Sequence, residues 1–395
     1  MSEENKHTRK EFLKGAAMGL AGGTLVAMGV YSYSPWRKVH LTREKRKMQD
    51  IGVCKSIKVT NITETSWFEN DVLMGDIKGA GGLLVSQYEY NWPPFGNGKG
   101  LGKGSYEEGI KEIKHLLPDR LDEAWDIIEK KCVHPENAGG YAALLEVEEL
   151  NGKMHKYLLD SGWSYKWTEK SFKREGIDKM LLNREIEALF ISHEHFDHFW
   201  GLPVTLKYDP TITIYIPDGF YDEGKQYLKD CGHRGKVITV KNGLKKHIPG
   251  MASYVFGEPI ICRVYGEQSL YFNVKDKGLI SVTGCCHQGI IQFAETAYDE
   301  IKYENDQLYG IYGGLHISPF EDWDPKYDDL VIALGDYDFK KIGCNHCTGI
   351  ITAKKFITRG YPVVEGTARF RSRDKAYLGN GDTITFGLDS DEESA

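Results

Sequence analysis

The segment Ser-His-Glu-His-Phe-Asp-His at residues 192–198 constrains the fold and chemistry of this chain more than any other. Three histidines and an aspartate fall within six residues, directly after an apolar stretch that ends at Ile191. Imidazole and carboxylate are ligands that proteins use for zinc, iron and manganese. Because Gly201 and Pro203 follow closely, we expect a strand that ends in a ligand-rich turn. A solvated polar loop is the plain alternative, but so dense a set of ligands serves no packing purpose.

Three later segments each offer one more histidine in a glycine-containing turn that follows an apolar run. One loop cannot surround an ion, so a metal centre needs such partners. Strand ends on one edge of a sheet converge, and we therefore expect these turns to meet the first loop. The turns are 284–289 with His287, 312–316 with His316, and 343–349 with His346.

Short runs rich in β-branched and aromatic residues alternate with helical patterns, which predicts an α/β layered body. We predict strands at 56–62, 82–88, 141–147, 156–160, 186–192, 211–216, 236–240, 260–265, 269–274, 279–283, 308–312 and 341–344. We predict helices at 106–117, 121–131, 170–180, 288–298, 324–334 and 352–359. Residues 90–138 include a glycine-rich stretch and are predicted to form an insertion, and the acidic tail 389–395 to be disordered.

These segments resemble the metallo-β-lactamase fold superfamily. Residues 193–198 resemble its His-x-His-x-Asp-His signature, and Asp160-Ser161-Gly162 resembles the Asp-x-Gly turn that precedes it. The turns at 284–289, 313–316 and 346–349 resemble the branch that includes the dihydropterin-ribofuranosylaminobenzene phosphate synthases. The resemblance covers roughly residues 55–370 apart from the insertion. It implies a four-layer αββα sandwich with metal ions at one edge.

The resemblance also implies a ligand set and one or two divalent metal ions, zinc first, with iron or manganese as alternatives. His193, His195 and His287 would bind a first metal ion, and Asp197, His198 and His346 a second. Asp160 would lie behind these ligands and hold a histidine in its tautomer. Asp197 would also be catalytic, by orienting a water molecule or taking its proton.

One departure from the family pattern concerns the bridging aspartate, which should follow a glycine in the third turn. This chain has Gly313-Gly314-Leu315-His316 there. His316 is a candidate replacement ligand or a substrate contact. Without the bridge, occupancy by a single metal ion is an alternative.

The chain has eight cysteines, and four of them flank the ligand histidines: Cys285, Cys286, Cys344 and Cys347. Thiolate ligation, a disulfide and buried packing are three possible uses for these four. We favour packing, because it is the most frequent role of a free cysteine.

The first segment resembles an export signal rather than part of the fold. Residues 8–14 read Thr-Arg-Lys-Glu-Phe-Leu-Lys, as in a twin-arginine signal with Lys10 at the second arginine, and an apolar run follows at 15–31. We expect residues 1–36 to be this signal or a membrane anchor, and residues 37–395 to be the metallo-β-lactamase-like domain. The protein would use the twin-arginine export machinery and reach the periplasm or cell surface. Membrane attachment through residues 15–31 or a cytoplasmic location are alternatives.

The charge distribution argues against nucleic-acid binding. The net charge is −7, although the first 50 residues hold ten Lys/Arg and only five Asp/Glu. The remainder is therefore strongly acidic, whereas phosphate contacts need a basic face. A small-molecule substrate fits better.

These observations predict a metal-dependent hydrolase that uses activated water on an ester, lactone or phosphodiester. A pterin-precursor synthase, which condenses a dihydropterin with a phosphoribosyl-aminobenzene, is one alternative. A non-enzymatic metal-binding protein or a di-iron redox protein is another.

Overall fold

The computed structural model describes residues 48–64, 140–220, 222–260, 264–319, 323–372 and 374–387. The predicted signal at 1–36, the insertion at 90–138 and the tail at 389–395 lie outside these residues. So do the predicted strand 82–88 and the helices 106–117 and 121–131. Among the described helices, none combines the length and apolar character that a bilayer crossing requires.

The strands form one continuous path that is folded into two halves. Its order is β14-β13-β11-β10-β2-β3-β4-β5-β6-β7, with β15 beside β2 and the β8–β9 hairpin beside β10. The first half contains β2 (Cys54–Thr63), β3 (Ala142–Glu149), β4 (Met154–Leu159), β5 (Ala188–Phe190), β6 (Thr213–Pro217) and β7 (Val237–Val240). The second contains β8 (Gly243–Ile248), β9 (Met251–Ile260), β10 (Val264–Val274), β11 (Gly278–Thr283), β13 (Leu308–Gly313) and β14 (Lys341–Cys344). β15 (Thr383–Phe386) pairs with β2 and so extends the first half. A separate parallel pair joins β1 (Gln49–Asp50) to β12 (Ile301–Lys302).

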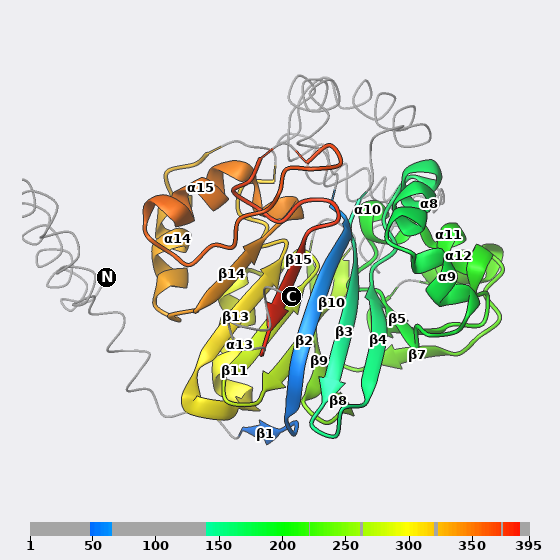
Figure 1. Cartoon of the computed structure of the whole chain (residues 1–395), viewed down its shortest axis with the longest axis horizontal. Helices are drawn as coiled ribbons and strands as arrows, with labels where there is room; N and C mark the ends of the chain where they lie inside the picture. Colours follow the sequence, from blue (N-terminus) through cyan, green and yellow to red (C-terminus); the bar gives the residue numbers. More distant parts are fainter. Residues whose placement is uncertain are drawn as a thin grey trace, which may run out of the picture.

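Helices cover the outer face of each half (Figure 1). One side carries α8 (Tyr165–Arg174), α9 (Ile177–Leu182), α10 (Phe196–Phe199), α11 (Leu202–Tyr208) and α12 (Asp222–Asp230). The other carries α13 (Ile290–Glu300), α14 (Tyr327–Gly335) and α15 (Ile350–Thr358), with short 3-10 turns η3 (Glu304–Asp306) and η4 (His346–Thr348).

Three apolar clusters account for the layering. Alternate residues of one strand enter different clusters, because successive side chains of a strand point to opposite faces. On β3, Ala143 and Leu145 pack between the two halves, whereas Ala142 and Leu144 pack against the helices. On β10, Phe272 likewise lies between the halves, whereas Tyr271 faces the other helices. The layers therefore follow the order helices, sheet, sheet, helices, which is the four-layer arrangement that the sequence predicted.

Two sequence predictions need correction. The helix predicted at 170–180 is two helices, α8 and α9, which are separated at Gly176, where the backbone is left-handed with φ +72°. The strand predicted at 260–265 spans the end of one strand and the start of the next, since β9 ends at Ile260 and β10 begins at Val264. The remaining predicted strands in the described residues are present, with ends shifted by a few residues.

The parallel strands of the two halves end at a common edge. β4 and β5 are parallel in one half, and β11, β13 and β14 are parallel in the other. Gln268 on β10 ties the halves together there, because its backbone N–H donates to Ser192 O at 2.8 Å and its side-chain Nε2 donates to Ile191 O at 2.6 Å. The turns that follow these strands therefore lie side by side.

Candidate metal centre

The ligand-rich segment begins as irregular chain after β5 and continues into the single-turn helix α10. Asp160 stands at the corresponding end of β4 and has a left-handed φ of 63°. Its backbone N–H donates to Phe190 O at 2.8 Å, and that of Ser161 donates to His198 O at 2.8 Å. These bonds hold the Asp160 turn against the histidine segment.

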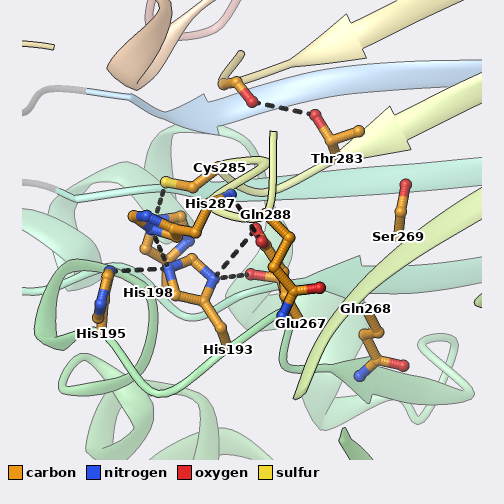
Figure 2. Close-up of polar contacts among 12 residues, drawn as sticks. His193, His195, His198, Glu267, Gln268, Ser269, Thr283, Cys285, His287 and Gln288 are labelled. Atoms are coloured by element: carbon orange, nitrogen blue, oxygen red, sulfur yellow. Dashed lines mark hydrogen bonds and ion pairs between the residues drawn. The ribbon is translucent and has the colours of Figure 1, made fainter. Parts of the chain in front are cut away.

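The structure brings His193, His195 and His287 together at this edge. His193 Nε2 lies 3.0 Å from His195 Nδ1 and 3.1 Å from His287 Nε2. His193 and His195 are buried, whereas His287 is partly exposed. Figure 2 shows these rings turned toward one another from two different loops. One nitrogen from each ring could therefore contact a common ion.

A second group consists of Asp197, His198 and His346, all of them buried. His198 Nε2 lies 3.0 Å from His346 Nε2 and 3.8 Å from Asp197 Oδ1. His346 Nε2 lies 3.2 Å from Asp197 Oδ2. Six of the seven candidate ligands predicted from the sequence thus lie together in the two expected groups of three. The seventh, His316, lies in neither group.

A network behind the ligands sets the tautomers of two histidines. Asp160 Oδ2 accepts from His198 Nδ1 at 2.7 Å and from the Ser192 hydroxyl at 2.7 Å. Because the Ser192 hydroxyl donates to Asp160, its oxygen accepts from His193 Nδ1 at 2.8 Å. Both rings therefore carry a proton on Nδ1 and turn Nε2 toward the centre.

Burial and neighbouring charges shift the pKa values of these ligands. Burial and the nearby His198 lower the pKa of His193 well below its usual range. Burial also lowers the pKa of His198, but the charges of Asp197 and Asp160 outweigh it and raise that pKa to about 9. Burial would raise the pKa of Asp197, but His198 and His346 hold it well below its usual range. A metal ion that binds here would displace the proton from His198 Nε2.

Two residues of this site were missed from the sequence, Ser192 and Glu267. Glu267 lies on β10 and is buried, and its Oε2 accepts the backbone N–H of His287 at 2.7 Å. Burial raises the pKa of Glu267 to about 7, although that N–H lowers it. Its other oxygen, Oε1, lies 4.0 Å from His193 Nδ1. Glu267 falls between the strands predicted at 260–265 and 269–274, so no pattern in the sequence marked it.

The four cysteines near the ligands divide into two pairs. Cys286 and Cys344 belong to the apolar cluster under α13 and α15, so the packing prediction describes them well. Cys285 and Cys347 face the centre instead, and their sulfurs lie 3.2 Å apart. All four thiols are free.

His316 joins neither predicted metal group. Its ring lies 4.2 Å from the ring of His287, measured between centroids. His316 does belong to a metal-capable group, by which we mean a group of side chains whose ligand atoms lie close enough to hold one metal ion. The other members of that group are Cys285 and Cys347. His316 is partly exposed, as is His287, so these two rings mark the side of the centre that faces solvent.

The residues present fit a divalent metal ion. In each group, one pair of imidazole Nε2 atoms lies about 3 Å apart. His193 Nε2 carries no proton, because the proton of that ring is on Nδ1, so this atom is free to bind a metal ion. Asp197 Oδ1 and His346 Nδ1 are buried and have no hydrogen-bond partner among the described residues. Imidazole and carboxylate together suit zinc, iron or manganese.

Backbone strain is concentrated at the same edge. Asp160, Cys286, His316 and His346 all have positive φ, between 46° and 63°. Left-handed backbone is unfavourable for residues other than glycine, and it persists where the surrounding structure enforces it. The four turns thus hold unusual conformations at the positions that bring the ligands together.

Comparisons with known proteins show what this chain is similar to. Residues 141–260 match the family model of the metallo-beta-lactamase superfamily. The 7,8-dihydropterin-6-methyl-4-(beta-D-ribofuranosyl)-aminobenzene-5'-phosphate synthase of Methanocaldococcus jannaschii is 24% identical over 256 residues, which cover 55% of this chain and 83% of that protein. A hydroxyacylglutathione hydrolase of Salmonella paratyphi A is 36% identical over 55 residues, 14% of this chain and 22% of that enzyme.

Solved structures also match this chain at low sequence identity. A metal-dependent hydrolase of the beta-lactamase superfamily is 19% identical, and the match covers 64% of this chain and 93% of that chain with a TM-score of 0.43. The Zn²⁺-bound PqqB of Methylobacterium extorquens is 11% identical, and the match covers 84% of this chain and 100% of that chain with a TM-score of 0.40.

Proposed function

We propose that this chain, in which residues 141–260 match the metallo-β-lactamase superfamily model, is a metal-dependent hydrolase. Its substrate would be a small ester, lactone or phosphodiester. The observation that carries the proposal is the pair of ligand groups at one edge, His193, His195 and His287 beside Asp197, His198 and His346. Asp160 fixes His198 directly and His193 through Ser192, which prepares both rings for a metal ion.

The roles of the residues follow from their positions. A bound divalent ion would supply a water molecule with a pKa near 7 and an electrophile for a developing negative charge. Among the described residues, Asp197 Oδ1 makes no hydrogen bond, so it can orient the water or accept its proton. His287 and His316 border the solvent-facing side, so the substrate would approach past them.

Metal analysis of the purified protein, combined with a screen of ester, lactone and phosphodiester substrates, tests this proposal. We expect one or two equivalents of zinc, iron or manganese and hydrolysis of one substrate class. Asp197→Asn should lower kcat about 10²- to 10⁴-fold, as loss of a general base does. His233, which bonds Ile212 O away from the centre, provides the control His233→Ala. Metal-free protein, or full hydrolysis by His195→Ala, would contradict the proposal.

A pterin-precursor synthase is the second candidate, and the 24% identity to the archaeal synthase favours it. Incubation with a dihydropterin and a phosphoribosyl-aminobenzene, followed by chromatography for a product that contains both rings, would reveal condensation. Cell fractionation also separates the candidates, because those substrates are cytoplasmic. We propose that residues 1–36 direct export, which favours the hydrolase, and fusion of these residues to a reporter tests that directly.

The same metal analysis distinguishes the hydrolase from two further functional hypotheses. A di-iron redox protein requires iron, so zinc alone would exclude it. A purely metal-binding protein requires ions without an open coordination position. Binding of a small anionic inhibitor at the loaded centre would show that a position is open.

A further inference from the structure

We propose that the Cys285 thiolate bridges the two metal positions, in the place where this chain lacks the family's bridging carboxylate. The proposal deepens the metal-dependent function and rests on it. It changes the expected ligand set from histidine and carboxylate alone to a set that includes one shared sulfur.

The position of the sulfur between the two groups is the first argument. Cys285 Sγ, His193 and His198 form one metal-capable group, in which all ligand atoms lie within 4.8 Å of one another. His193 belongs to the first predicted site and His198 to the second. Cys285 Sγ lies 3.1 Å from His198 Nε2, the ring atom that the Asp160 bond turns toward the centre. Figure 2 shows the sulfur directed at the histidine group from the turn after β11.

The turn that carries Cys285 is pressed against the network behind the ligands. A Cβ on Gly284 would come within 2.3 Å of Ser192 Oγ and 3.3 Å of Asp160 Oδ2, so only glycine allows this approach. On the other side, a Cβ on Gly314 would lie 2.4 Å from Gly284 O and 2.6 Å from Cys347 Sγ. The sulfur position is therefore set by neighbours on both sides.

The other candidates for a bridge are less well placed. His316 shares no metal-capable group with the six predicted ligands among the described residues. Cys286, the next residue, is equally buried but points into the apolar cluster under α13. Cys347 groups only with Cys285 and His316. Cys285 alone among these shares a group with both predicted sites.

The chemistry of a thiolate suits this role. A coordinating thiol loses its proton, so the S–H bond breaks and the proton passes to solvent as the sulfur–metal bonds form. The sulfur then supplies the negative charge that the missing carboxylate would have supplied. Thiolate is a soft ligand and favours zinc or iron over magnesium or calcium.

X-ray absorption at the zinc edge tests the bridge in the wild-type protein. We load the full chain with two equivalents of Zn²⁺ under reducing conditions and count sulfur neighbours near 2.3 Å, the usual Zn–S distance. A bridging sulfur gives one sulfur per zinc on average. A terminal sulfur gives half that value, and nitrogen and oxygen neighbours alone give none. Either of the last two results overturns the bridge.

Cobalt substitution assigns the sulfur to a residue. Co²⁺ bound to the wild-type protein should show an intense near-ultraviolet band of thiolate-to-metal charge transfer. Cys285→Ser should lose this band and keep the visible bands that histidine ligands produce. Cys286→Ser is the matched control from the same turn and should keep both, as should Cys347→Ser. A full band in Cys285→Ser would overturn the assignment.

The outcomes separate this proposal from the broader function. Wild-type protein that binds no metal would overturn both. Metal bound with no sulfur neighbour would overturn only the thiolate bridge and leave the hydrolase in place. A Cys285–Cys347 disulfide that mass spectrometry finds in zinc-loaded protein would also overturn the bridge. If Cys285→Ser fails to fold, the wild-type absorption measurement still decides.

Discussion

At the residue scale, the candidate metal centre is organised by a small network that lies behind the predicted ligands. Asp160 accepts hydrogen bonds from both Ser192 and His198. The Ser192 oxygen in turn accepts a hydrogen bond from His193 Nδ1 and so fixes the orientation of that ring. One carboxylate thereby fixes one ligand of each predicted metal site. Mutation of partners of this kind typically lowers metal affinity about 10- to 100-fold.

Ser192→Ala tests this relay. The substitution leaves His193 Nδ1–H without its acceptor, so the ring loses its orientation and Nε2 no longer faces the centre in a fixed tautomer. We expect metal affinity to fall about 10- to 100-fold, measured by competition with a chromophoric chelator. Ser161→Ala is the matched control, because that buried hydroxyl contacts Thr205 instead of the ligands. Equal affinity in both variants would contradict the relay.

A second residue-scale prediction concerns His247, which lies away from the metal ligands. Its Nε2 contacts Ser253 Oγ at 2.8 Å, and its ring packs on Phe190 and Tyr215. Burial, assisted by Lys245, lowers the pKa of His247 to about 4. The unfolded chain binds the proton near pH 6.5 while the folded protein does not, so stability falls as the pH drops from about 6.5 to 4.

The size of this effect is at most roughly 3 kcal/mol in the free energy of unfolding. Urea denaturation at several pH values, compared between wild type and His247→Gln, measures it. The variant should lose that part of the pH dependence. Parallel curves for the two proteins would show that His247 does not cause it.

The sequence predicted the candidate ligands, which the structure brings together, but not the residues that contact them from behind. His193, His195, Asp197 and His198 are dense enough to be recognised, since metal ligands have few other reasons to cluster. Ser192 and Glu267 carry no such signal, because a serine after a strand and a glutamate within one are common. Their importance arises only from tertiary contacts, in which Ser192 meets Asp160 and Glu267 meets the backbone of His287.

At the element scale, the centre depends on how closely the turns after β5, β11 and β13 approach one another. The sequence predicted those turns because glycine marks them. It did not predict how tightly they pack, since that depends on strands far apart in the chain. The same limitation explains the corrected helix at 170–180, where a left-handed Gly176 divides one helical pattern into α8 and α9.

Gly284→Ala tests the close approach of the turns. The new Cβ would lie 2.3 Å from Ser192 Oγ, so the turn after β11 must move away from the turn after β5. We expect His287 to separate from His193 and the bound metal to fall by at least one equivalent, measured by elemental analysis. Gly152→Ala is the control, because its Cβ meets nothing within 4 Å although φ is +85°.

The control separates strain from steric conflict. Gly152→Ala should cost on the order of 1 kcal/mol of stability through backbone strain and leave the metal content unchanged. If Gly284→Ala retained the wild-type metal content, the packing of these turns would not be needed for the site.

At the scale of the whole molecule, the metal centre joins the two halves of the fold. Asp160 and residues 193–198 belong to the first half, whereas Glu267, His287 and His346 belong to the second. Apolar residues such as Leu145 and Phe272 hold the halves together along their length. At the edge, the described contacts between them are largely polar ones among the ligands. A metal ion would replace repulsion among buried imidazoles by shared coordination.

Metal removal should therefore destabilise the whole protein and not only the centre. A metal ion at one hundred times its dissociation constant stabilises the native state by about 2.7 kcal/mol. For a domain of this size, that free energy corresponds to roughly 5–10 °C in Tm. Calorimetry with and without a chelator measures the shift, and added zinc should restore it. His346→Ala, which removes a ligand from the second half, should show a smaller shift. An unchanged Tm on chelation of protein shown to contain metal would mean that the ion does not bridge the halves energetically.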